Sequence, residues 1–164
     1  EAYRRYGLFA HRAGTYLATF RAVAKAYPSV PRTQILSDLV DISPGDEGKW
    51  FATAKELGMY EVALKLAHES PCDPKTLARA ARDFVDREPD FAQGAGFAAL
   101  YWLTLGHGYE ATALDVWGAY HSTLKAAEHL GTLNDTKTRI QQLVAQEAAG
   151  GFVRHVLGRE LALA

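Results

Sequence analysis

Apolar residues recur at helical spacing along most of this chain, and glycines or prolines interrupt the pattern at intervals. The stretch from Ser43 to Ser70 shows this most clearly, because two apolar stripes with a repeat of three to four positions stand on either side of Gly58. The stripes comprise Trp50, Phe51, Ala54 and Leu57, followed by Tyr60, Ala63, Leu64 and Ala67. Glycine readily adopts the left-handed conformation that ends a helix. The pattern therefore predicts two antiparallel helices that are joined by a tight turn at Gly58 and share a core.

Polar residues before the first stripe indicate where its helix begins. The Ser43 hydroxyl can accept a hydrogen bond from an unpaired amide of the first turn. Pro44 suits the first helical position, where a missing N–H costs nothing. Asp46 and Glu47 place negative charge near the positive end of the helix dipole. We therefore expect a helix that is capped by Ser43 and starts at Pro44.

Further helices are predicted by the same periodicity. Pro28 and Pro31 bracket a short connection, and Asp73 is expected to cap a helix whose first residue is Pro74. No segment shows the strict alternation that is typical of a strand. The expected helices are a pair within 1–27 with a turn at Ala13 and Gly14, then 31–41, 73–87, 89–105, a long helix ending at 130 before Gly131, one capped by Asn134 or Asp135, and 152–161 after the joint Gly150-Gly151.

The segment 89–105 is apolar around much of its circumference, so we expect it to be the most buried helix. It contains the stretch 94–99, GAGFAA, which matches a loose dinucleotide-binding pattern. That pattern indicates a nucleotide site only where it joins a strand to a helix. Here it lies inside a predicted helix. We therefore interpret it as a smooth face on which another helix packs closely.

The stretch from Leu57 to Leu64 resembles the turn and the start of the second helix of a tetratricopeptide repeat. In that family a glycine permits the turn, an aromatic residue two places later fills a groove, and a small alanine further on lets helices approach. Gly58, Tyr60 and Ala63 occupy these three positions. The resemblance implies a tetratricopeptide-like or broader α-solenoid arrangement.

The family's first-helix Trp and Gly positions hold Glu47 and Phe51 in this chain. Glycine turns of the same kind are expected at Gly14, Gly58 and Gly106, with spacings of 44 and 48 residues. These spacings exceed the ~34 residues of a tetratricopeptide unit and lie nearer the ~40–47 of HEAT and armadillo repeats. We predict an all-α fold of stacked antiparallel helix pairs, an α–α superhelix that is tetratricopeptide-like or HEAT-like. A compact irregular helical bundle is the alternative.

Composition adds few constraints. The chain has 164 residues, of which 48% are hydrophobic and 23% charged, and this is ordinary for one globular domain over residues 1–164. A formal net charge of −1 provides no overall attraction to nucleic acid or anionic membranes, and no apolar run reaches the ~20 residues needed to span a bilayer. The single cysteine excludes an internal disulfide. Because the chain begins at Glu1 without a Met, we expect it to be a fragment of a longer protein. We expect its location to be cytoplasmic.

Candidate catalytic and metal-binding groups are sparse. The histidines show no pair at the i,i+3 or i,i+4 spacing that a helical metal site uses, and we expect no metal or cofactor. They are His11, His68, His107, His121, His129 and His155. Cys72 stands just before a predicted helix, where the dipole would favour a thiolate, with His68 four residues earlier as a possible base. The surrounding Pro-Cys-Asp-Pro sequence is more simply interpreted as a rigid corner.

Two charged clusters complete the candidates. Carboxylates crowd residues 83–90, but arginines stand between them, so a mutually neutralising surface is favoured over acid–base catalysis. The second cluster is basic and lies near the N-terminus, where Arg5 and Arg12 share one helix face and Arg21 and Lys25 share another. Together these four residues form a basic surface that could bind an acidic partner or phosphates. Alternatively, acids between residues 38 and 47 receive these arginines within the fold.

The sequence therefore predicts a non-catalytic scaffold domain that binds a protein or peptide, such as the rest of its parent chain. The possible partner-binding face comprises Arg5, Arg12, Arg21 and Lys25. Nucleic-acid contact through the same face is the alternative, although a dedicated nucleic-acid domain would carry a denser basic surface. An enzyme using Cys72, His68 or the acids at 83–90 is the least favoured hypothesis. The sequence does not predict an oligomeric state.

Overall fold

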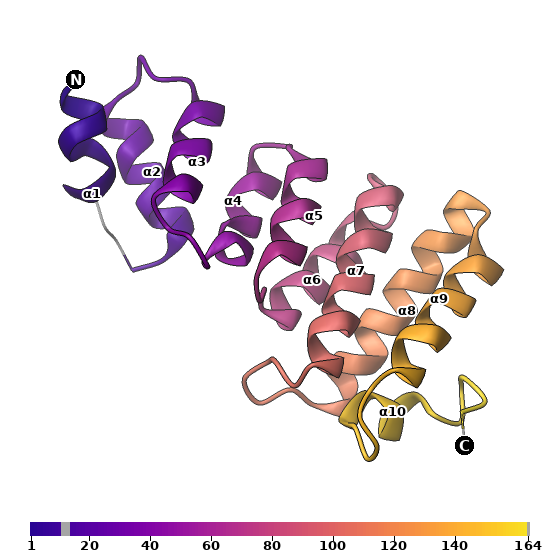
Figure 1. Ribbon diagram of the computed structural model, residues 1–164. Coiled ribbons are helices and arrows are strands. Elements are labelled where there is room, and N and C mark those ends of the chain that lie inside the picture. The colour runs from indigo at the N-terminus through magenta and orange to yellow at the C-terminus, as the bar shows by residue number, and fades with distance from the viewer. Residues whose placement is uncertain (11–13, 164) are drawn as a thin grey trace. The chain divides into compact units, whose positions relative to one another are not determined.

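The computed structural model describes residues 1–10 and 14–163, and every regular element within these ranges is a helix (Figure 1). The predicted all-α class is confirmed. Residues 11–13 lie outside the described ranges, and they include His11, Arg12 and the predicted turn residue Ala13. Among the described residues, no helix combines the length and the apolar character that crossing a lipid bilayer requires.

The chain forms two compact units, Glu1–Pro71 and Cys72–Ala164. A single helical-repeat domain over 1–164 stays a prediction. The elements of the first unit are the π-helix η1 (Tyr3–Gly7), α1 (Leu8–Ala10), α2 (Tyr16–Ala26), α3 (Arg32–Asp41), the 3-10 helix η2 (Glu47–Trp50), α4 (Phe51–Glu56) and α5 (Tyr60–Glu69). Helix α2 packs on α3 and α4, and α5 packs on η2 and α4. The core of this unit includes Phe20, Val23, Ile35, Leu36, Leu39, Trp50, Phe51 and Ala54.

The helix that was expected to start at Pro44 begins later, and Ser43 does not cap it. The Ser43 hydroxyl donates to the carbonyl oxygen of Leu39 at 2.6 Å and accepts from the indole nitrogen of Trp50 at 2.9 Å. It therefore serves the end of α3 and the buried indole instead of the next helix. A turn containing Gly45, with φ of 91°, then leads into η2 and α4.

The turn at Gly58 has the predicted geometry. Gly58 has φ of 72° and donates to the Lys55 carbonyl at 3.0 Å, and Met59 donates to the Ala54 carbonyl at 3.0 Å. These two bonds form a Schellman motif, which pairs carbonyls that the helix end would otherwise leave open. The predicted pair of helices joined at Gly58 is thus confirmed as α4 and α5, which pack on each other. Gly106 and Gly131 end α7 and α8 with the same two bonds.

The second unit contains α6 (Pro74–Phe84), α7 (Pro89–Thr104), α8 (Ala113–Leu130), α9 (Leu133–Ala145) and α10 (Phe152–Leu157). Helices α6, α7 and α8 all contact one another (Figure 1). Helix α6 begins as predicted, because the Asp73 carboxylate accepts from the Lys75 amide at 3.3 Å and Pro74 follows it. The start predicted for α9 is wrong. Asn134 and Asp135 lie inside that helix, whose cap position is Thr132.

Helix α7 carries nine buried residues, more than any other helix in the described part of the chain, as its sequence predicts. Gly96 lies where α7 meets α8. A methyl group at this position would collide with the Thr123 side chain and would lie 3.3 Å from the Ala119 carbonyl oxygen. The interpretation of this glycine as a close helix–helix contact is therefore confirmed.

Candidate functional site

The predicted basic face is only partly described. Arg5 forms an exposed ion pair with Glu1 at 3.1 Å, and Arg21 forms one with Glu56. Lys25 is exposed and forms no ion pair with any residue in the described ranges, while Arg12 lies outside them. Exposed ion pairs contribute little to stability, typically about 0–1 kcal/mol. These pairs are therefore weak enough for a partner to compete for the arginines, and the face stays a prediction.

Within the described ranges, the acids between residues 38 and 47 form no ion pair with Arg5, Arg21 or Lys25. Asp38 accepts from the Tyr3 hydroxyl at 2.7 Å, and Asp46 accepts from the Tyr16 hydroxyl at 2.8 Å. Burial, followed by the bond to its carboxylate partner, raises the pKa of each tyrosine. The acids thus fix tyrosines inside the first unit.

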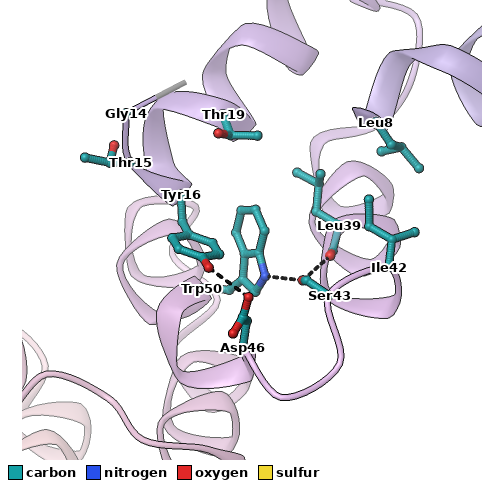
Figure 2. Close-up of a pocket in the computed structure, with 10 residues that line it drawn as sticks. All are labelled: Leu8, Gly14, Thr15, Tyr16, Thr19, Leu39, Ile42, Ser43, Asp46 and Trp50. Atoms are coloured by element: carbon teal, nitrogen blue, oxygen red, sulfur yellow. Dashed lines mark hydrogen bonds between the residues drawn. The ribbon is translucent and has the colours of Figure 1, made fainter. Parts of the chain in front are cut away.

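A small pocket of about 160 Å³ opens between α2, α3 and η2 (Figure 2). Figure 2 shows the Tyr16 ring beside the Trp50 indole, with ring centroids 4.8 Å apart in an edge-to-face arrangement. The polar atoms of these rings bond to Asp46 and Ser43 of the same pocket. Pockets for small molecules usually measure roughly 300–1,000 Å³. The structure therefore favours a joint that holds these helices together over a ligand site.

The position of Cys72 before a helix suggests a lowered thiol pKa, but the structure indicates a raised one. Its side chain is buried with 4% exposure, and burial, with the Asp73 charge, raises its pKa to about 12. Desolvation therefore outweighs any effect of the helix dipole on the pKa, and the thiol is protonated and enclosed. This environment agrees with a rigid corner and removes the main support for a thiol enzyme.

Three of the four acids at 83–90, namely Asp83, Asp86 and Asp90, are exposed, and Glu88 is half-buried. Asp83 pairs with Arg82 at 2.9 Å, and Asp86 lies 3.6 Å from the His129 imidazole. Both carboxylates are more than half exposed, so they share no enclosed site for acid–base chemistry. Within the described ranges, no cluster of three or more histidine, cysteine or carboxylate side chains could hold a metal ion.

Three exposed apolar side chains stand at the connection between α7 and α8, and we call them the apolar corner: Leu105, Tyr109 and Leu114. Their exposed fractions are 54%, 85% and 81%. The sequence places Tyr109 in a third version of the Gly–x–Tyr turn, but extra residues separate it from Gly106, and it points into solvent instead of filling a groove. Large apolar side chains that are exposed close together along the chain are candidates for contact with a partner.

A groove lies between α6 and α8 and includes Leu114 of the apolar corner, and we call it the α6–α8 groove. Its volume is about 280 Å³, and it is lined by Lys75, Ala78, Arg79, Arg82, Leu114, Asp115, Gly118 and Ser122. Three of these side chains are basic and one is acidic. Sequence analysis missed this site, although the spacing of Lys75, Arg79 and Arg82 already places them on one helical face.

No protein-family model matches this chain, and no curated protein or solved structure is significantly similar to it. Function must therefore be argued from the geometry and chemistry of the chain itself.

Proposed function

We propose that this chain is a non-catalytic helical scaffold domain that binds a protein or peptide. The observation that supports it best is the apolar corner. Leu105 and Tyr109 follow the end of α7, and Leu114 lies in the first turn of α8. Tyrosine and leucine at such exposure gain free energy when a partner removes them from water, and aromatic residues are enriched in protein interfaces.

The backbone beneath the apolar corner is held in place, which lowers the entropy that binding must overcome. Gly106 ends α7 with a Schellman motif. At the start of α8, the Thr112 amide donates to the Asp115 carboxylate at 2.7 Å, as part of a capping box. These contacts present the apolar side chains from two defined helix ends.

The finer architecture belongs to the same proposal. The Gly58 turn and the antiparallel pair α4–α5 support stacked helix pairs of a tetratricopeptide-like or HEAT-like superhelix. Such stacks offer extended surfaces whose residues vary without disturbing the core. The partner is a protein or peptide, which includes the remainder of a longer parent chain, and the setting is cytoplasmic. Nucleic-acid contact through Arg5, Arg12, Arg21 and Lys25 is the less favoured alternative, because a dedicated nucleic-acid domain carries a denser basic surface.

Photo-crosslinking tests the proposal. A benzoylphenylalanine at position 109 should crosslink to a specific protein in an extract of the source cells, or to a second copy of the chain. The double change Leu105→Ser and Leu114→Ser should abolish that crosslink. The matched control is Val62→Ser, which removes a 36% exposed valine from α5 and should leave the crosslink intact. No specific product at position 109, or a product that survives the double change, would contradict the proposal.

A further inference from the structure

The charges of the α6–α8 groove are unevenly compensated. Lys75, at one end, lies 4.0 Å from the Asp115 carboxylate, and Arg82, at the other end, bonds to Asp83 at 2.9 Å. Arg79 stands between them on α6, is exposed, and forms no ion pair with any described residue. Its polar contact is a 3.4 Å hydrogen bond to the Thr76 hydroxyl. The centre of the groove therefore carries a positive charge that no described carboxylate pairs with.

Helix α8 carries a further cation that, like Arg79, lacks an ion pair with any described residue. Leu114, Gly118, His121 and Lys125 follow at intervals of four, three and four residues and are all exposed, so one face of α8 presents them together. Lys125 forms no ion pair with the residues that the structure describes. On the α8 side, the groove is lined by Leu114, Asp115, Gly118 and Ser122, and Lys125 follows on the same helix three residues beyond Ser122.

Gly118 is unexplained by the free chain. It lies inside α8 with ordinary helical geometry, and a methyl group there would meet no atom within 4 Å. A glycine in a helix interior costs roughly 0.5–1 kcal/mol relative to alanine. Neither backbone conformation nor internal packing therefore requires it. Its absent side chain keeps the floor of the α6–α8 groove open beside Arg79.

We propose that the α6–α8 groove binds an acidic peptide segment of another protein, with an apolar residue of that segment seated on Leu114 and its carboxylates facing Arg79, Arg82 and Lys125. Arginine suits this role, because its planar guanidinium accepts a carboxylate in a bidentate geometry. The span from Leu114 to Lys125 is about 16 Å along the helix. It would accommodate roughly five extended residues. The inference rests on the proposed function and names the chemistry of its partner.

The test uses the full chain, immobilised, and a random library of peptides about 12 residues long, which covers the span in an extended or helical form. Selected peptides should be enriched in Asp and Glu and should contain at least one large apolar residue. The variant Arg79→Glu with Arg82→Glu should lose this acidic preference. The control Lys137→Glu with Arg159→Glu changes the net charge equally at exposed positions outside the groove and should retain it.

Fluorescence anisotropy of one selected, labelled peptide gives the magnitude. The Arg79→Glu, Arg82→Glu variant should bind about tenfold or more weakly, and affinity should fall as salt rises from about 50 to 500 mM. Gly118→Phe provides a second variant, which fills the groove without changing charge and should weaken binding similarly. Thermal unfolding followed by circular dichroism verifies that each variant is folded.

Contrary outcomes have distinct meanings. Selected peptides that depend on Leu114 but not on Arg79 and Arg82 would overturn this inference and leave the proposed function standing. A single-stranded oligonucleotide that displaces the labelled peptide and binds more tightly would also overturn it, because the groove would then be a nucleic-acid site. Failure to select any peptide, together with no crosslink at position 109, would overturn both.

Discussion

Two glycines in the second unit occupy helix interiors for opposite reasons. Gly96 of α7 faces Thr123 of α8 so closely that no side chain fits between the helices. Gly118 of α8 faces open space beside α6. The first glycine is required by the packing of this chain with itself, whereas the second leaves room that the chain does not use. Packing within the chain thus explains Gly96. It does not explain Gly118, for which we invoke a binding partner in the groove.

The contrast between the closed interior and the open groove should be largest in thiol chemistry. At pH ~8, a pKa of about 12 gives Cys72 roughly a thousandfold smaller thiolate fraction than an ordinary cysteine. We expect iodoacetamide to alkylate Cys72 at least about a thousandfold more slowly than a cysteine placed in the groove by Ser122→Cys in a Cys72→Ala background. Mass spectrometry of timed samples measures both rates. Equal rates would show that the interior opens as readily as the groove.

The next largest difference is expected between the free energies of unfolding of two valine variants, one at Gly96 and one at Gly118. Gly96→Val forces apart α7 and α8 and should lower the free energy of unfolding by about 2–3 kcal/mol. Gly118→Val meets open space and should change it by no more than about 0.5 kcal/mol. Urea unfolding followed by circular dichroism gives both values. Adding Thr123→Ala to Gly96→Ala should recover part of the loss, because it removes the hydroxyl that the new methyl group meets.

The smallest expected effect is the gain in stability when Gly118 is replaced by alanine. Gly118→Ala should raise the free energy of unfolding by about 0.5–1 kcal/mol, since alanine favours the helix and the added methyl has space. Gly96→Ala, the matched control, should lower it. If Gly118→Ala destabilises the chain, then the position is packed by this molecule, and the argument for an open groove fails.

Much of the helical framework was predictable from local signals. Asp73 and Pro74 begin α6, and Gly58 and Gly131 end their helices, because each of these effects acts within one turn. Ser43 was misassigned because its hydroxyl bonds to Trp50, seven residues further along the chain, and a local capping rule does not weigh that competitor.

The candidate site was less predictable than the fold. The burial of Cys72 follows from tertiary packing, which reverses the effect that a helix dipole has on an exposed thiol. The basic spacing on α6 is visible in the sequence, but its pairing with Leu114 and Gly118 depends on the contact between α6 and α8. Tyr109 could be recognised as a turn residue, yet only the structure shows that it is exposed.

The hydrogen bond from the Trp50 indole to the Ser43 hydroxyl, at the end of α3, makes Trp50 a spectroscopic reporter. Trp50 is the only one of the three tryptophans in the first unit, and its indole is bonded and 3% exposed, while Trp102 and Trp117 belong to the second unit. Melting of the last turn of α3 would release the indole N–H to water and shift its emission to the red. With Trp102 and Trp117 replaced by phenylalanine, the intrinsic fluorescence would follow the first unit alone and reveal whether it unfolds separately.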